Sequence, residues 1–125
     1  MRLLLDTHVF LWWVETPRTL TPEAQAAIAA PDNVVFVSVV SAWEMAIKAG
    51  LGRLKPPDDV EAAVDRGGFM KLGIAFAHAA RAGTLPRHHG DPFDRMLIAQ
   101  AHCESLTLVT RDAALGIYGV AILLA

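Results

Sequence analysis

Short apolar segments alternate with helical patterns along almost the whole chain, and this alternation limits the folds that it can adopt. The apolar runs are "RLLL" (2–5), "VVFVS" (34–38), "FMKLGI" (69–74), "LTLVT" (106–110) and "GVAIL" (119–123). Their continuous apolar character is typical of strands that are covered on both faces. Strands that alternate with helices form parallel sheets. We therefore predict an α/β fold, a three-layer α/β/α sandwich with a central parallel sheet of about five strands.

Helical patterns fill the segments between these runs. They cover residues 8–15, 21–30, 41–50, 58–67, 75–83 and 91–105. Thr21 before Pro22 and Asp91 before Pro92 are good N-terminal caps, and Ser41 is expected to cap the third helix. No linker or repeat interrupts the pattern, so we expect a single domain over residues 1–125.

Composition narrows the class of protein. Hydrophobic residues make up 54% and charged residues 19% of the 125, which argues against disorder. The net charge of −2 lacks the basic footprint of a simple nucleic-acid binder. The single cysteine, Cys103, cannot form a disulfide or a cysteine zinc site, and we expect it to be buried in its helix. No apolar run is long enough to span a membrane, so we expect a cytoplasmic protein with no membrane contact.

Acidic residues follow the predicted strands where a ligand site would form. In an open parallel sheet, ligands bind beyond the carboxyl ends of the strands. Asp6 follows the first run directly, Glu44 lies in the next helix after the second run, and Asp112 follows the fourth. Asp91 and Asp94 open the helix before the fourth run. If that helix lies antiparallel to the strands, its first turn reaches the same edge.

Each acid has a simpler explanation as a helix cap. Asp6, Asp91 and Asp112 can each cap the segment that follows, and Ser41 with Glu44 forms the S-x-x-E pattern of a capping box. Capping does not explain why acids with few cations among them should gather at one edge. Converging carboxylates repel one another unless a cation is present. Mg²⁺, or alternatively Mn²⁺, fits carboxylate oxygens best, and one or two such ions suit phosphodiester hydrolysis by an activated water.

Four segments, taken together and in this order, resemble PIN-domain ribonucleases, in particular VapC-type toxins of type II toxin–antitoxin pairs. They are "LLLDTHVFLWW" (3–13), "SVVSAWEMAIKAGLGRL" (38–54), "DPFDRMLIAQA" (91–101) and "LVTRD" (108–112). The resemblance covers essentially the whole chain and implies a PIN-like α/β/α sandwich with an acidic pocket at one sheet edge. It also implies an RNA substrate and a small cognate antitoxin. The apolar segment 8–15, with Trp12 and Trp13, would suit a homodimer or antitoxin interface, although core packing is the alternative.

The resemblance also implies roles for individual residues. The expected catalytic and metal-binding residues are Asp6, Glu44, Asp94 and Asp112. Asp91 is expected to be a cap that touches the site. Hydroxyl groups near the metal would come from Thr7, Ser41 and Thr110, each of which also suits a plain turn or cap.

Five basic residues near the acids are candidates for RNA contacts. They are Arg87, His88, His89, Arg95 and Arg111. For the first three the alternative is a solvated loop, and for Arg95 and Arg111 it is an ion pair with the neighbouring acids. His8 follows Asp6 closely, but its side chain is expected to turn away from it.

Two alternative functions fit some of these features. In one, the chain is an inactive PIN-like scaffold whose acids serve only as caps. In the other, it is a different acidic-pocket enzyme for phosphoryl transfer, such as a receiver or a phosphatase. A phosphatase would need an aspartate where His8 stands, and a receiver would need a lysine after its last strands, whereas no lysine follows Lys71.

Overall fold

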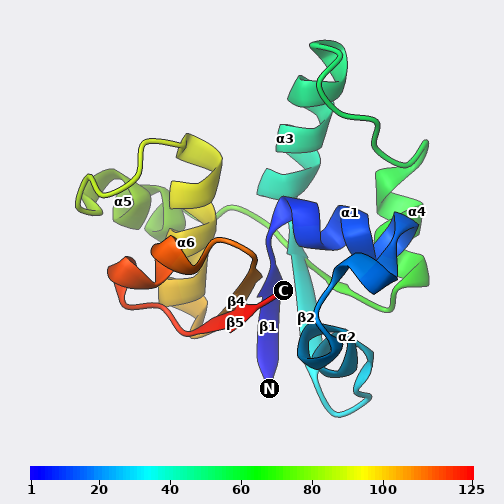
Figure 1. The fold of residues 1–125 in the computed structure, drawn as a ribbon. Coiled ribbons are helices and arrows are strands. Elements are labelled where there is room, and N and C mark those ends of the chain that lie inside the picture. The colour runs from blue at the N-terminus through cyan, green and yellow to red at the C-terminus, as the bar shows by residue number, and fades with distance from the viewer.

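The structure is a computed structural model that describes residues 1–125, and its central element is a five-stranded, wholly parallel sheet (Figure 1). The strands are β1 (Arg2–Leu5), β2 (Val34–Ser38), β3 (Met70–Leu72), β4 (Thr107–Thr110) and β5 (Ile122–Leu124). They lie in the order β3-β2-β1-β4-β5, with Leu5 of β1 in register with Val37 of β2 and Val109 of β4. After β1, the chain adds β2 and β3 on one side of this strand and then β4 and β5 on its other side. The strand order therefore reverses at β1, and open α/β sheets bind ligands at such a switch point.

Helices cover both faces of this sheet, as predicted (Figure 1). The helices are α1 (Thr7–Glu15), α2 (Pro22–Ala29), α3 (Val39–Gly50), α4 (Val60–Arg66), α5 (Phe76–Thr84) and α6 (Pro92–Glu104), with short 3₁₀ turns η1 (Pro17–Thr19) and η2 (Ala113–Tyr118). In Figure 1, α5 and α6 lie on one side of the sheet, and α1, α2 and α4 lie on the other. None of the helices combines the length and the apolar character that crossing a membrane requires.

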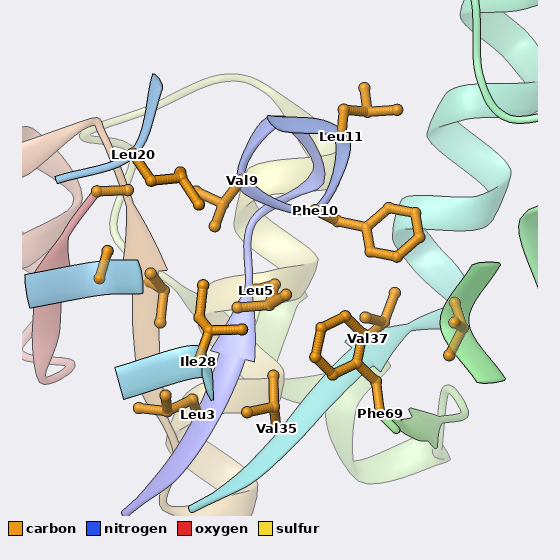
Figure 2. Close-up of a cluster of buried hydrophobic side chains, with 14 of the residues drawn as sticks. Leu3, Leu5, Val9, Phe10, Leu11, Leu20, Ile28, Val35, Val37 and Phe69 are labelled. Atoms are coloured by element: carbon orange, nitrogen blue, oxygen red, sulfur yellow. The ribbon is translucent and has the colours of Figure 1, made fainter. Parts of the chain in front are cut away.

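Two buried clusters explain why β1 is a run of leucines. Leu3 and Leu5 point into a cluster that Val9 and Phe10 of α1 complete from the helix side (Figure 2). Leu4 points the other way, into a second cluster formed with α6 and η2. All three leucines are fully buried, and each contributes about 2 kcal/mol by burial. This two-sided core fixes the position of the carboxyl end of β1, where Asp6 begins the next helix.

Three local predictions were wrong. Helix α3 begins at Val39 and is capped by Ser38, whose Oγ accepts from Val40 N at 3.0 Å, so Ser41 lies inside the helix and is not its cap. Strand β5 begins at Ile122 rather than residue 119, because η2 occupies the preceding segment and Gly119 ends it with a φ of 80°. Cys103 is exposed, not buried.

Candidate active site

A cavity of about 460 Å³ lies at the carboxyl edge of the sheet, beside the switch point at β1. Its lining residues are Asp6, His8, Val9, Trp12, Glu44, Asp91, Asp94, Arg111 and Asp112. All five acids that the sequence singled out are among them. They come from the end of β1, from α3, from the start of α6 and from the turn after β4, which are distant in sequence. Helix α6 runs antiparallel to the strands, so its first turn reaches this edge, as expected (Figure 1).

Asp6 joins α1 to β4. Its Oδ1 accepts a hydrogen bond from Thr7 N at 2.7 Å, which caps α1, and its Oδ2 accepts from Thr110 Oγ1 at 2.7 Å. The backbone N–H of Asp6 donates to Val109 O at 2.9 Å. Burial raises the pKa of Asp6, the bonds from Thr110 and Thr7 oppose this rise, and the charge of Glu44 adds to it. The carboxylate is therefore held rigidly in a place where its charge is costly.

Glu44 is the most enclosed acid of the cavity, with 3% of its surface exposed. Thr7 Oγ1 donates to its Oε1 at 2.6 Å, and Ser41 Oγ lies 2.9 Å from the same threonine oxygen. Lys48, one helical turn further along α3, donates to Oε2 and forms an ion pair. This bond raises the pKa of Lys48. Sequence reasoning missed this partner of Glu44, although the E-x-x-x-K spacing is the signal for it.

Asp94 lies in the first turn of α6 and is bound by the loop before it. His89 Nε2 lies 2.7 Å from Asp94 Oδ2. Burial raises the pKa of Asp94 to about 6; the charge of Asp6 also raises it, and the hydrogen bond to His89 lowers it. Asp91 caps the same helix, with Oδ1 accepting from Phe93 N at 2.8 Å and from Asp94 N at 3.2 Å. His89 thus contacts the acid cluster instead of standing in solvent.

Asp112 closes the cavity on the β4 side. Its backbone N–H donates to Thr110 Oγ1 at 3.1 Å, and its Oδ1 accepts from Ala114 N at 3.1 Å and caps η2. The Thr110 hydroxyl consequently bridges Asp112 and Asp6. Capping and convergence are therefore both correct for Asp6, Asp91 and Asp112: each acid caps a helix or turn and lines the cavity as well.

The basic residues around the cavity divide into different roles. Arg95 pairs with no acid, because its guanidinium donates to four backbone carbonyls, those of Ala82, Leu85, Pro86 and His89. The alternative considered for Arg95, an ion pair with a neighbouring acid, is therefore wrong. The His88 ring packs edge-on against Tyr118, Arg87 is exposed, and Arg111 lines the cavity. His8 also lines it, with its ring 5.9 Å from that of Trp12, contrary to the expectation that it turns away.

The donor set suits one class of cation. No three carboxylate, imidazole or thiol groups stand close enough together to hold an ion between them directly. A zinc-type site, which takes three or four protein ligands, does not fit this arrangement. A Mg²⁺ site does, because this ion keeps several waters and binds through one or two carboxylates. The charge of Asp6 raises the pKa of Asp94, and a cation beside the two carboxylates would offset this repulsion.

Comparison with known proteins identifies the fold. The chain matches the model of the PIN domain over residues 3–120. It is 34% identical over 116 residues to Ribonuclease VapC22 of Mycobacterium tuberculosis, and the aligned region covers 90% of this chain and 88% of that protein. The solved structure of VapBC2 from Rickettsia felis bound to a promoter DNA fragment matches 99% of this chain and 98% of its own, with a TM-score of 0.73 and 15% identity. VapBC-1 from nontypeable Haemophilus influenzae matches 98% and 97%, with a TM-score of 0.65 and 16% identity.

Proposed function

The chain belongs to the PIN-domain family, among its VapC-type members, and on this premise we propose that it is a Mg²⁺-dependent endoribonuclease, acting in the cytoplasm as the toxin of a toxin–antitoxin pair. The observation that carries the proposal is the meeting of five carboxylates at one cavity. Among them, the pKa of Asp6 and that of Asp94 are both raised. Caps alone do not require such a convergence, whereas a cation-dependent hydrolase does.

Asp6 and Asp94 would hold the ion directly, and Glu44 and Asp112 would reach it through water. The bound ion, Mg²⁺ or alternatively Mn²⁺, supplies an activated water and stabilises the charge that develops on the phosphodiester. The chain itself provides the positions of the carboxylates. Thr110 orients Asp6 and Asp112, while Thr7 and Lys48 fix the position of the Glu44 carboxylate. Such supporting bonds set both the orientation and the basicity of a ligand.

Protein partners are supported by a separate surface. Four apolar residues at four-residue spacing form an exposed stripe along α3 and the residue that caps its C-terminus: Val39, Trp43, Ile47 and Leu51. A contiguous exposed apolar stripe of this kind is typical of a protein–protein interaction site. We propose that the chain forms a homodimer and binds a small cognate antitoxin. The solved neighbours are toxin–antitoxin complexes, such as VapBC2 and VapBC-1, and this supports the second partner.

Cleavage of a structured RNA, such as a tRNA, by wild-type protein and by Asp94→Asn tests the proposal. We expect Mg²⁺- or Mn²⁺-dependent cleavage by wild type, none in EDTA, and a loss of at least about a hundredfold in the variant with an unchanged circular dichroism spectrum. Equal cleavage by both proteins would remove Asp94 from the mechanism. A protein that neither cuts RNA nor changes its melting temperature with Mg²⁺ would be an inactive scaffold. Co-purification with the product of a short neighbouring gene tests the antitoxin.

A further inference from the structure

Arg111 is held in one orientation at the cavity by three contacts. Its guanidinium carbon lies 4.2 Å from the centre of the Trp12 ring, which also lines the cavity. Its Nε donates to Ala125 O at 2.9 Å, and its Nη2 donates to Thr19 O. An arginine stacked and bonded in this way has lost most of its rotamer freedom, so it can bind a further group at little entropic cost.

The charge of Arg111 is not neutralised by the acids around it. It forms no ion pair with any aspartate or glutamate of the chain, although five of these acids line the same cavity. Two other bases near the cavity acids are engaged, since Lys48 pairs with Glu44 and His89 with Asp94. His8 also lines the cavity, with its ring beside that of Trp12. A guanidinium has five N–H donors, and the Nη1 group of Arg111 has no hydrogen-bond partner in the chain. Arg111 therefore presents free N–H donors, and none of the acidic side chains that line the cavity pairs with its charge.

An RNA phosphate needs such a residue here. A phosphodiester that approaches five carboxylates is repelled, and a bound cation faces the carboxylates as well as the substrate. The planar guanidinium matches phosphate oxygens in both geometry and charge. Arg95 shows the contrast, because its donors are spent on four backbone carbonyls and it is purely structural.

We propose that Arg111 is a preorganised phosphate-binding residue of the cavity, which holds the RNA backbone beside the acids. This inference rests on the proposed nuclease function. The competing explanation is that Arg111 only ties the segments of Thr19 and Ala125 to β4, in which case its removal would lower stability without changing how RNA binding depends on salt.

The test compares Arg111→Met, Arg111→Lys and the control Arg2→Met. Arg2 has matching contacts, with its guanidinium carbon 5.5 Å from the Phe36 ring centre and Nη1 donating to Glu104 O at 2.6 Å. It is the first residue of β1, at the amino end of the strand, whereas Asp6 follows its carboxyl end. Both Met variants therefore lose one charge, one aromatic contact and at least one carbonyl contact, but only one of them loses these at the cavity.

Two quantities are measured with one fluorescein-labelled single-stranded RNA. Its Kd is followed by anisotropy against salt concentration in an Asp94→Asn background with Mg²⁺, and its KM is measured in the active protein. We expect Arg111→Met to weaken binding roughly tenfold and to reduce the slope of log Kd against log salt by about 0.7. Arg111→Lys should keep the slope, and Arg2→Met should match the parent protein in both quantities.

The outcomes separate the two proposals. If the parent protein binds and cuts RNA but Arg111→Met leaves the slope, Kd and KM unchanged, Arg111 is a structural tie and the inference is overturned while the nuclease stands. If Arg2→Met shows the same loss as Arg111→Met, the effect is one of net charge and the inference is also overturned. A wild-type protein that neither binds nor cuts RNA overturns the nuclease function and this inference together.

Discussion

His89 Nε2 and Asp94 Oδ2 lie 2.7 Å apart, so the loop before α6 is bound directly to the acid that opens this helix. The pKa of Asp94 is raised to about 6, first by burial and then by the charge of Asp6, and the bond to His89 lowers it only in part. A proton and a metal ion therefore compete for this carboxylate in the range where many enzymes operate.

The first prediction concerns the pH dependence of metal binding. Below a pH of about 6 Asp94 holds a proton, and above it the carboxylate is free to bind a cation. We expect Mn²⁺ affinity, followed by calorimetry, to rise with pH by up to about tenfold per unit below the pKa and to level off above it. Asp94→Asn should bind weakly and show less of this dependence. An affinity that is flat from acid to neutral pH in wild type would count against Asp94 as a ligand.

The second prediction concerns the stability of the metal-free protein. Because the pKa of Asp94 is higher in the folded state than its ordinary value, its contribution to the free energy of unfolding is fully present below a pH of about 4 and is lost as the pH rises through about 6. Asp94→Asn has no carboxyl group to ionise at this position, so its stability does not fall in this way as the pH rises. With EDTA at a pH of about 8, we expect the variant to melt roughly 4 °C above wild type, about 1 kcal/mol. The difference should shrink as the pH falls toward 4.

The control for this melting experiment is Asp58→Asn, since Asp58 is an exposed acid outside the cavity. It carries the same change in charge but no buried carboxylate. We expect its melting temperature to stay within about 1 °C of wild type at both pH values. A rise in Asp58→Asn equal to that of Asp94→Asn would assign the effect to net charge instead of the cavity.

The third prediction concerns the ion pair between Lys48 and Glu44. Lys48→Met leaves Glu44 buried without its cation, which we expect to cost about 2 kcal/mol in urea unfolding. In the double variant Lys48→Met, Glu44→Gln the unpaired charge is gone, and most of this loss should be recovered. Lys71→Met serves as the control, since Lys71 pairs with exposed Glu61 and solvent-exposed pairs stabilise a fold only weakly. Equal losses in Lys48→Met and Lys71→Met would contradict the buried character of the first pair.

The fold could be predicted from the sequence because short stretches of residues indicate each strand and each helix. Uninterrupted apolar runs such as 2–5 and 106–110 mark strands with two covered faces, and the helical patterns between them require parallel connections. The residue pattern around Asp6 and Asp94 does not by itself show that these two acids meet. They meet because α6 runs antiparallel to β1, a direction that follows from the alternation of strands and helices and not from the sequence of α6 alone.

The remaining details could not be predicted because they depend on side-chain packing in three dimensions. Val39 and Val40 are β-branched and therefore untypical of a first helical turn, which hid the start of α3 at Val39. Arg95 is adjacent to Asp94 in sequence, yet its guanidinium turns toward carbonyls of the preceding loop. Neighbours along a helix point in different directions, so adjacency in sequence was a poor guide to contact.

The fourth prediction concerns Thr110, whose hydroxyl donates to Asp6 Oδ2 at 2.7 Å and accepts from Asp112 N at 3.1 Å. This side chain is fully buried, and its bond lowers the pKa of Asp6 against the effect of burial. Thr110→Val keeps the shape and removes the hydroxyl, so Asp6 loses a donor and binds a proton more readily. We expect Mn²⁺ affinity and RNA cleavage to fall about 10- to 100-fold, and the pH at which affinity levels off to rise. Thr110→Ser restores the hydroxyl and should recover most of both. If Thr110→Val destabilises the protein but leaves metal affinity and its pH dependence at wild-type values, the hydroxyl supports the fold alone and does not position Asp6.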